Sequence, residues 1–463
     1  MGLSQNPDMK ISTQSILAIL CFTFPQSLLL AQQPNQGLML KTEAASPGYT
    51  LIAPFGGQST YLIDLDGQVV HQWTTERKPS QAAYLLADGS LIRTYKVANE
   101  VFNVPGGPAG GIQKFDWDGK LIWDYQVSNQ LMMSHHDIEP MPNGNVLVVA
   151  WEFKTQQQAI AAGRDPQKLA DGCLWPEIIL ELKPKGLNDA EIVWQWKLWD
   201  HLIQSHDESK NNYGRPDQHR EKVDLNYIDR PIADWIHCNS IDYNPQLNQI
   251  MLCGRTFDEL WVIDHSTTTE EAATGQGGQS GHGGDLLYRW GNPFTYFAGT
   301  PFDQKLFGQH DPHWIPEGMP GAGRVLIFNN GSDQDERPFS TVDELQTTLD
   351  SSGKYLSADG EPFGPQKLSW RYEAGNQLYS QRVSGSQRLS NGNTLICEGE
   401  TGRVFEVTTA GKVVWDYENV LGQSPDSQQP AVGRSLGGVA MFRAYRYSPD
   451  HSAFSGRTLK PQN

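Results

Sequence analysis

Basic residues are scarce in this sequence. The 463-residue chain has 36 Lys and Arg against 53 Asp and Glu, a formal net charge of −17, and no long run of Lys or Arg. Proteins that bind nucleic acids display basic surface to neutralise phosphates, so we do not expect a nucleic-acid partner. Charged residues make up only 19% of the chain, which argues against a disordered or coiled-coil protein.

The chain also lacks an apolar run long enough to cross a membrane. Such a helix needs about 20 apolar residues, whereas the apolar stretch at residues 16–24 is interrupted by Pro25. Lys10 precedes this stretch and Ala31 ends a second short apolar run, an order typical of a secretory signal. We therefore expect a signal peptide at residues 1–31, no stable membrane anchor, and a periplasmic or secreted mature chain of residues 32–463 that forms a single domain.

Cysteines are few and are not spaced as metal ligands. The mature chain keeps Cys173, Cys238, Cys253 and Cys397, and no two of them form a C-x-x-C pair, so a zinc site is not expected. Four cysteines permit three full disulfide pairings, and their spacing does not choose among them. A chain of this size is able to fold on its hydrophobic core without them.

What the sequence has in abundance is turn residues and tryptophan, with 45 Gly, 28 Pro and 14 Trp. A unit recurs six times: a hairpin with Gly or Asn in its turn, then a strand, an Asp-Gly-like turn and a strand that closes on Trp or Tyr. The closing segments are residues 61–73, 112–125, 178–196, 260–290, 340–372 and 402–417.

Four short strands per unit at this spacing are typical of β-propeller blades, because one such sheet must stack on its neighbours to bury both faces. We therefore predict an all-β, six-bladed β-propeller with long loop insertions near residues 153–176, 200–232, 265–284 and 331–366. An open β-sandwich is the main alternative, and six near-equivalent units weigh against it. The polar, low-complexity insertion at 265–284 is predicted to be a solvated flexible loop. The strand-like segment 439–447 is predicted to complete the first blade.

Three histidines occupy equivalent places in successive units. His136, His237 and His310 each stand seven residues before a predicted hairpin turn, and the pattern His-Asp-x-x-x-x-Pro occurs at both 136–142 and 310–316. The first strand of each propeller blade lines the central channel, so side chains at one level on adjacent blades face a shared cavity. We therefore expect these three imidazoles to converge.

A cation is expected beside them. A hairpin centred near residues 246–247 pairs positions whose numbers sum to about 493, which places Arg255 opposite His237. Histidine clusters often bind metals, but a guanidinium repels a divalent cation unless an anion lies between them. The only carboxylates at this level, Asp137 and Asp311, directly follow histidines in the chain. A tetrahedral oxyanion fits imidazoles and a guanidinium better, so we expect no metal and no other cofactor.

The linked motifs identify a resemblance. They are Asp234-Trp-Ile-His-Cys-Asn-Ser240, Arg255, Gly308-Gln-His-Asp311, His135-His-Asp137 and the ending Arg443-Ala-Tyr-Arg-Tyr447. Over most of the mature chain they resemble the bacterial aryl-sulfate sulfotransferases. That family implies a six-bladed propeller that moves a sulfuryl group from an aryl sulfate donor to a phenolic acceptor, both small molecules, without a nucleotide donor.

The resemblance also implies roles for individual residues. His310 would be the nucleophile, transiently sulfated in a ping-pong reaction, while His136, His237 and Arg255 would hold the sulfuryl oxygens and assist proton transfer. Four further residues are candidates for substrate contacts: Asn239, His313, His135 and Trp235. His313 competes with His310 for the role of nucleophile, and His135 competes with His136 for its place in the site. Trp235 is able to stack on an aryl ring.

Two other functions are compatible with the sequence. One is a non-catalytic periplasmic propeller that binds an anionic ligand or a protein in its channel, because propellers host many functions. The other is a metal- or quinone-dependent enzyme. The assembly state, including a homo-oligomer, and the natural donor and acceptor are also left open.

Overall fold

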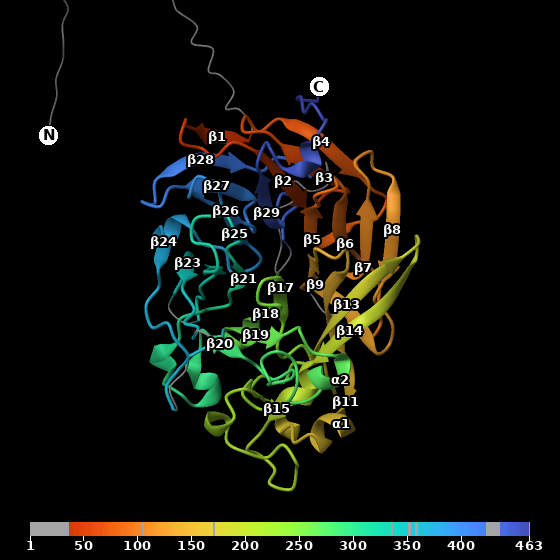
Figure 1. The fold of residues 1–463 in the computed structure, drawn as a ribbon, viewed down its shortest axis with the longest axis vertical. Helices are drawn as coiled ribbons and strands as arrows, with labels where there is room; N and C mark the ends of the chain where they lie inside the picture. The colour runs from red at the N-terminus through yellow and green to blue at the C-terminus, as the bar shows by residue number, and fades with distance from the viewer. Residues whose placement is uncertain are drawn as a thin grey trace, which may run out of the picture. The chain divides into compact units, whose positions relative to one another are not determined.

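Most strands of this chain form six small antiparallel sheets arranged around a central axis (Figure 1). The structure is a computed structural model that describes residues 37–103, 106–169, 172–334, 337–350, 353–356, 360–422 and 436–462. The sheets are the blades of a six-bladed β-propeller, so the predicted fold is confirmed. The predicted signal peptide at residues 1–31 lies outside the described residues.

Blades 1 to 3 each contain four strands, which run in the following order from the innermost outwards. Blade 1 is β29 (Met441–Tyr447), β2 (Tyr49–Pro54), β3 (Ser59–Ile63) and β4 (Val69–Thr74); blade 2 is β5 (Pro79–Leu85), β6 (Leu91–Lys96), β7 (Gly110–Phe115) and β8 (Leu121–Gln126); blade 3 is β9 (Met132–Pro140), β10 (Val146–Glu152), β13 (Glu177–Lys185) and β14 (Asp189–Lys197).

Blades 4 to 6 follow the same order, and blade 6 has a fifth strand. Blade 4 is β17 (Cys238–Asn244), β18 (Gln249–Gly254), β19 (Glu259–Asp264) and β20 (Tyr288–Trp290); blade 5 is β21 (His310–Trp314), β22 (Val325–Asn329), β23 (Thr341–Leu345) and β24 (Trp370–Glu373); blade 6 is β25 (Gly385–Arg388), β26 (Thr394–Glu398), β27 (Arg403–Val407), β28 (Val413–Glu418) and β1 (Leu38–Lys41).

The two ends of the domain close the ring. The C-terminal strand β29 pairs antiparallel with β2, with Tyr447 opposite Tyr49, so it completes the first blade as predicted. On the neighbouring blade, β1 pairs antiparallel with β28 and covers its outer edge. Blade 1 therefore joins residues from both ends of the domain, and the ring cannot close until the C-terminal strand is in place.

The closing tryptophans of the repeat link each blade to the next. In every blade one indole of the fourth strand donates a hydrogen bond to a backbone carbonyl of the following blade, either in the loop between its third and fourth strands or, at Asp189, at the first residue of its fourth strand. The six bonds are Trp73 to Asp116 (3.0 Å), Trp123 to Asp189 (3.0 Å), Trp196 to Gly284 (2.7 Å), Trp290 to Pro365 (2.9 Å), Trp370 to Thr409 (2.8 Å) and Trp415 to Leu65 (2.9 Å). The last of these bonds joins blade 6 to blade 1.

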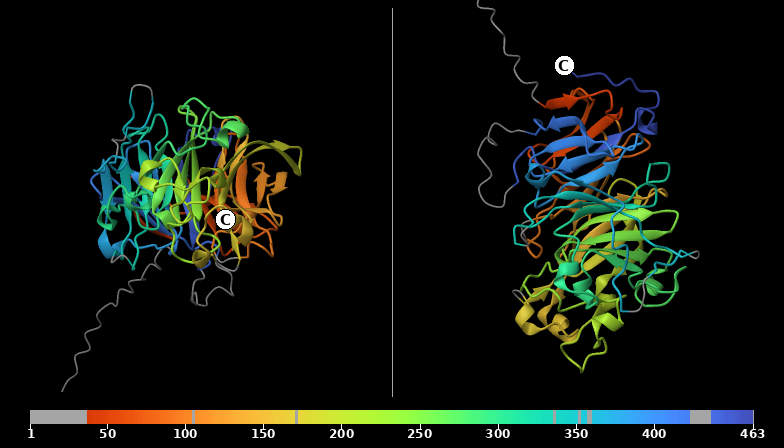
Figure 2. Two further views of the ribbon diagram at one scale, coloured as in Figure 1. Left: turned by 90° about the horizontal axis from the view of Figure 1, so that it is seen from below. Right: turned by 90° about the vertical axis from the view of Figure 1, so that its left-hand side faces the viewer.

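The insertions within blade 3, between blades 3 and 4, and within blade 4 pack together at one edge of the ring, at the lower end of Figures 1 and 2 (right). They contain β11 (Lys154–Thr155), α1 (Gln156–Ala161), η1 (Pro166–Lys168), β12 (Cys173–Leu174), η2 (Leu198–His201), β15 (Leu202–Ile203), η3 (Pro216–Gln218), β16 (Val223–Asp224) and α2 (Thr269–Ala272). Among the described residues, no helix is long and apolar enough to span a bilayer.

The segment at residues 265–284, predicted to be a solvated flexible loop, is exposed to solvent at residues such as Glu270, Gln276 and His282, but it also contains regular structure. Thr268 and Glu271 form a capping box that starts α2, and Ala272 is fully buried. The Ala272 carbonyl accepts a hydrogen bond from His201 Nε2 at 2.8 Å, and Gly284 accepts one from Trp196. Low complexity predicted mobility, but the cap and the contacts with blade 3 satisfy the polar groups of the loop.

The ring-closing tryptophan gives a test of this arrangement. Trp415→Phe removes the indole donor and leaves the Leu65 carbonyl without it, and Trp415 is fully buried. We expect a loss of about 1–3 kcal/mol in the free energy of unfolding, measured as a lower urea midpoint by circular dichroism.

Trp370→Phe is the matched control. It removes the same kind of bond between blades 5 and 6, but this bond lies in an exposed setting where water replaces the indole donor. Its midpoint should fall clearly less than that of Trp415→Phe. Equal losses in the two variants would show that the burial of the ring-closing bond does not matter.

Candidate active site

Three imidazoles lie together near the start of the inner strands of blades 3, 4 and 5. His136 is in β9, His237 directly precedes β17, and His310 is the first residue of β21. The rings of His136 and His237 are 4.5 Å apart between centroids and meet edge to face. The charges of His237, His310 and Arg255 all act on His136. The predicted convergence of the three histidines with Arg255 is therefore present in the structure.

Backbone irregularities aim these side chains. His136 and His237 have left-handed φ angles of 46° and 54°, and Asp311, next to His310, has 58°. The pairing of each inner strand with the next strand shifts register at this point, between Ser134 and Ile138 in β9, Cys238 and Ile241 in β17, and His310 and His313 in β21. Bulges turn a side chain away from the regular alternation of a strand, and left-handed non-glycine residues cluster at functional sites.

The tautomer of His310 is set by Asn330. The side-chain amide of Asn330 donates to the carbonyls of Ser380 (2.7 Å) and Val383 (2.9 Å), so its oxygen faces His310 Nδ1 at 2.8 Å. Nδ1 therefore carries the proton and Nε2 keeps the lone pair, which accepts a weaker 3.2 Å bond from the Val383 N–H. Burial first, and then the charge of Arg255, hold the pKa of His310 well below 6.5. A neutral imidazole with an available lone pair is a competent nucleophile.

His237 is paired with a carboxylate. Its Nδ1 lies 2.5 Å from Asp234 Oδ2, and the other oxygen of Asp234 accepts a hydrogen bond from Trp151 Nε1 at 2.9 Å. Burial acts to raise the pKa of Asp234, but the charge and hydrogen bond of His237 outweigh it and hold that pKa below its ordinary value. An ionised Asp234 accepts the Nδ1 proton of His237, which fixes the orientation of the ring and makes Nε2 the nitrogen that carries the lone pair when the ring is neutral.

Arg255 supplies the permanent positive charge. It begins η4 (Arg255–Phe257), directly after β18, and the pairing of Cys238 with Gly254 places it beside His237 as predicted. In the described part of the chain, no carboxylate forms an ion pair with Arg255, and the bond that we find for its guanidinium is a 3.4 Å contact with the Gln381 carbonyl. Its charge is thus available to an anion at the histidine cluster.

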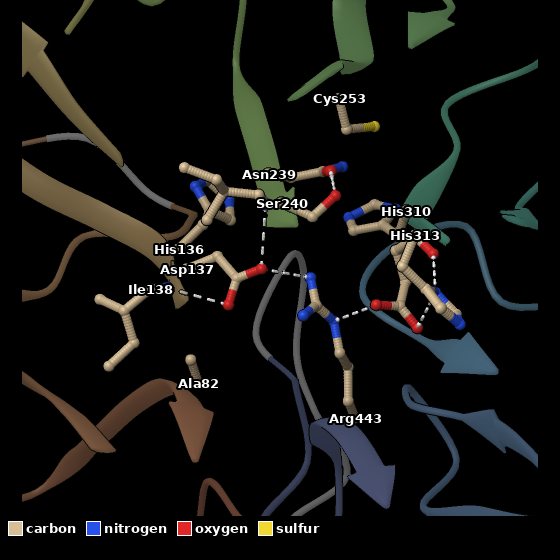
Figure 3. A network of polar contacts seen from close by, with 12 residues as sticks. Ala82, His136, Asp137, Ile138, Asn239, Ser240, Cys253, His310, His313 and Arg443 are labelled. Atoms are coloured by element: carbon tan, nitrogen blue, oxygen red, sulfur yellow. Dashed lines mark hydrogen bonds and ion pairs between the residues drawn. The ribbon is translucent and has the colours of Figure 1, made fainter. Parts of the chain in front are cut away.

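Asp137 and Asp311 do not face the cluster as ligands, because Arg443 holds both. Arg443 lies 2.7 Å from Asp137 Oδ2 and 3.1 Å from Asp311 Oδ1 (Figure 3). Burial opposes protonation of Arg443, but the two carboxylates outweigh it and raise the pKa of Arg443. Across the described ranges, no group of three or more His, Cys, Asp or Glu side chains is arranged to hold a metal ion.

The four secondary candidates have other positions. Trp235 is fully buried, with Phe257 packed against its ring and Arg164 over its face, so the prediction that it stacks on a substrate does not fit the structure. It precedes the inner strand and points into the core between blades. Asn239 is also fully buried, and its amide donates to the Gln309 carbonyl at 2.8 Å, which supports the backbone before His310.

His135 and His313 do not replace their neighbours in the cluster. His135 is fully buried behind His136, and the two Nδ1 atoms are 2.8 Å apart. His313 is partly exposed, and its ring nitrogen bonds the Asp311 carbonyl on the Arg443 side of the cluster. In Figure 3, the ring of His313 lies farther from His136 than the ring of His310 does. The three buried cysteines of the described chain form no disulfide.

Three residues that set the chemistry were not predicted from the sequence: Asp234, Asn330 and Glu177. Asp234 stands three positions before His237 within one of the family motifs, and its role could have been sought there. Asn330 directly follows a strand in which Phe328 pairs with His310, so the register of that hairpin is the signal that would have found it. Glu177 starts β13, far from any histidine in sequence, and no local pattern points to it.

These features define a class of protein: a six-bladed β-propeller with a buried histidine–arginine site where adjacent blades meet. Residues 40–419 match the family model described as arylsulfotransferase (ASST), so the chain belongs to the arylsulfotransferase family. The resemblance drawn from the sequence motifs is confirmed, and the family supports sulfotransferase activity in general.

Solved structures with a similar arrangement share little sequence with this chain. A protein of unknown function from Bacteroides caccae is 14% identical, with 86% of this chain and 98% of that chain covered and a TM-score of 0.44. A catalytically inactive virginiamycin B lyase from Staphylococcus aureus with quinupristin is 9% identical, with 82% and 87% covered and a TM-score of 0.37. Comparison with curated proteins gave no matching sequence.

Gly107 gives a test of the packing around the cluster. A Cβ at this position would lie 1.9 Å from His136 Cε1, so Gly107→Ala must displace the imidazole. We expect the variant to fold and to lose about 10-fold or more in the rate of sulfuryl transfer from an aryl sulfate, because small misplacements of reacting groups are costly.

Gly144→Ala is the control. Gly144 has a similar left-handed φ of 86°, against 75° for Gly107, but a Cβ there meets nothing within 4 Å. Both variants carry a similar backbone strain, and only Gly107→Ala adds the clash with His136, so Gly107→Ala should lose more thermal stability than Gly144→Ala and should be the variant that loses rate. An equal loss of rate in both would trace the effect to backbone strain.

Proposed function

We propose that this protein transfers a sulfuryl group from an aryl sulfate ester to a phenolic acceptor through a covalent sulfohistidine at His310. The observation that carries the proposal is the fixed tautomer of His310, whose Nε2 lone pair lies in the field of the Arg255 cation. The family match supports the reaction class. We also propose that residues 1–31 are a signal peptide and that the mature protein is periplasmic or secreted.

In the first half of the reaction, His310 Nε2 attacks the sulfur in line while the bond from sulfur to the aryl oxygen breaks. Negative charge moves to the departing oxygen, which takes a proton from the imidazolium of His237. Arg255 and His136 hold the sulfuryl oxygens. Catalysis of this kind depends on positioning and on cations around the transferred group, by analogy with phosphoryl transfer.

In the second half, a phenol enters the place that the first product has left. Its oxygen attacks the sulfur of the sulfohistidine, the bond between Nε2 and sulfur breaks, and its proton passes to His237. Phenols ionise near pH 10, so a base is needed at neutral pH. Asp234 stabilises the charge that His237 then carries. The sequence of product release before acceptor binding is ping-pong turnover.

A non-catalytic propeller that binds an anion in its channel is the second candidate. Arg255 and the three imidazoles would suit such a role as well. The Asp234–His237 pair favours catalysis, because a carboxylate that orients an imidazole is the arrangement of a general acid and base.

Mass spectrometry tests the covalent step directly. Brief exposure to an aryl sulfate without acceptor should add one sulfuryl group to the peptide that contains His310, and His310→Ala should abolish it. His313→Ala is the control and should keep the adduct, since His313 lies outside the cluster. An adduct on a different histidine would move the nucleophile, and none on any peptide would favour the binding role.

The pH dependence follows from the lowered pKa of His310. Protonation removes its lone pair, so the nucleophile is lost only as the pH falls through the pKa of His310 in the folded protein, which lies well below 6.5. We expect the pre-steady-state release of the donor's phenol at saturating donor not to fall between neutral pH and 6.5. A rate that halves near 6.5 would show an imidazole with an ordinary pKa.

A further inference from the structure

A buried chain of hydrogen bonds runs behind His136. His136 Nδ1 contacts His135 Nδ1 at 2.8 Å, and His135 Nε2 contacts Glu177 Oε2 at 2.8 Å. His136 is 4% exposed, His135 0% and Glu177 1%. The function proposed above uses only the His136 end of this chain. Two of its three titratable groups have no role there.

The chain is held rigidly. Neighbouring residues of a strand normally point to opposite faces, and the left-handed φ of 46° at His136 is what brings its ring back against that of His135. The ring of His135 stacks on Trp151, with centroids 4.1 Å apart. The second oxygen of Glu177 accepts the backbone N–H of Cys238 at 2.8 Å. Glu177 therefore presents a single oxygen to His135.

This geometry permits two proton arrangements when both rings are neutral. One proton lies between the two Nδ1 atoms. If both nitrogens carried a proton, the two hydrogens would clash, and if neither did, two lone pairs would face each other. If Glu177 is ionised, His135 donates from Nε2 and accepts at Nδ1, so His136 donates from Nδ1 and its Nε2 is an acceptor. If Glu177 is protonated, every bond reverses and His136 Nε2 becomes a donor.

An oxyanion distinguishes the two arrangements. Its oxygens accept hydrogen bonds from a donor and are repelled by a lone pair, and a buried ionised carboxylate repels it further. The charged and titratable groups around His136 are His237, His310, Arg255 and His135. The charges of His135 and Asp234 act on Glu177. Among the described side chains, His135 is the one that hydrogen-bonds the ring of His136, so the donor state of His136 is set through the chain.

We propose that the Glu177–His135–His136 chain takes up one proton when the sulfuryl group binds, which turns His136 Nε2 from an acceptor into a donor. This inference rests on the proposed function and names Glu177 as a positioning residue for it. The proton comes from water and enters at His136 Nε2. The Nδ1 proton of His136 moves to His135 Nδ1, and the Nε2 proton of His135 moves to Glu177 Oε2.

Both imidazoles stay neutral in this exchange, and Glu177 alone changes charge. Burial raises the pKa of Glu177, which favours its protonation. Burial and the neighbouring cations hold the pKa of His136 low, which disfavours an imidazolium there. Anion affinity therefore falls as the pH rises, because the unliganded chain must gain a proton to bind.

Calorimetry of inorganic sulfate binding to the full chain measures the proton directly. Titrations in two buffers of different ionisation enthalpy give the number of protons taken up per sulfate. We expect about one proton per sulfate for the wild type at alkaline pH. Glu177→Gln mimics protonated Glu177, because its amide can donate to His135 Nε2 while its oxygen still accepts the Cys238 N–H. It should take up almost no proton, bind sulfate about 10-fold or more tightly than the wild type at alkaline pH, and lose the dependence of its affinity on pH.

Glu181→Gln is the matched control. Glu181 lies on the same strand β13 and pairs with His265 at 2.9 Å, so this variant removes a similar carboxylate from a similar pair away from the cluster. It should bind sulfate and protons as the wild type does. The wild-type proton number alone tests the inference if Glu177→Gln does not fold.

The outcomes separate this inference from the proposed function. Sulfate binding without proton uptake in the wild type, or equal uptake in Glu177→Gln, overturns the role of the chain and leaves the sulfohistidine mechanism standing. A wild type that does not bind sulfate at millimolar concentration overturns the anion site and with it both proposals. Proton uptake lost in Asp234→Asn but kept in Glu177→Gln would place the proton on His237 instead.

Discussion

The ion pair network of Arg443 is the interaction on which the site depends. This one guanidinium, on the last strand of the chain, binds carboxylates from blades 3 and 5 (Figure 3). The groups around it reach every blade of the ring. From blade 1 to blade 6 they are Arg443, the Tyr84 hydroxyl, Asp137, the Ile241 N–H, Asp311 and the Ser386 N–H. Breaking a buried pair of this kind costs about 3–5 kcal/mol, because it leaves a charge without a partner.

The position of this network explains how the histidine cluster is built. Asp137 and Asp311 directly follow His136 and His310, so the charges that hold the blades together also fix the residues that carry the imidazoles. His136, His237 and Asp311 all adopt left-handed backbone. Such conformations cost about 1–3 kcal/mol each and persist only where the surroundings determine them. The buried ion pairs of Arg443 with Asp137 and Asp311 fix the backbone next to these left-handed residues.

The electrostatics of the site contrast with those of the chain. The protein carries a net charge of −17. At the cluster, however, the carboxylates lie behind the imidazoles, and the Arg255 cation lies close to the imidazoles. Asp234 lies behind His237 and Glu177 behind His135. Both carboxylates belong to one structural unit, because Trp151 stacks on His135 and also donates to Asp234. The tautomers of the imidazoles are therefore decided by side chains that lie behind the rings.

The sequence by itself determined the fold and the main members of the site. A repeated pattern of turns, alternating strands and closing tryptophans specifies a blade, because the hydrophobic period and the turn chemistry are local properties. The same repeat placed His136, His237 and His310 at one level, and hairpin register placed Arg255 beside them. It also predicted that the C-terminal strand completes the first blade.

Only the tertiary structure decided how those side chains are aimed. The bulge at His136 and the burial of Trp235 have no local signature, since the bulge arises in the pairing of β9 with β10 and Trp235 is buried by its packing against Phe257 and Arg164. The partners Asn330 and Glu177 come from parts of the chain with no motif of their own, so sequence could not show which nitrogen of each imidazole holds the proton. Proton positions follow from contacts between distant segments, and such contacts exist only once the ring has closed.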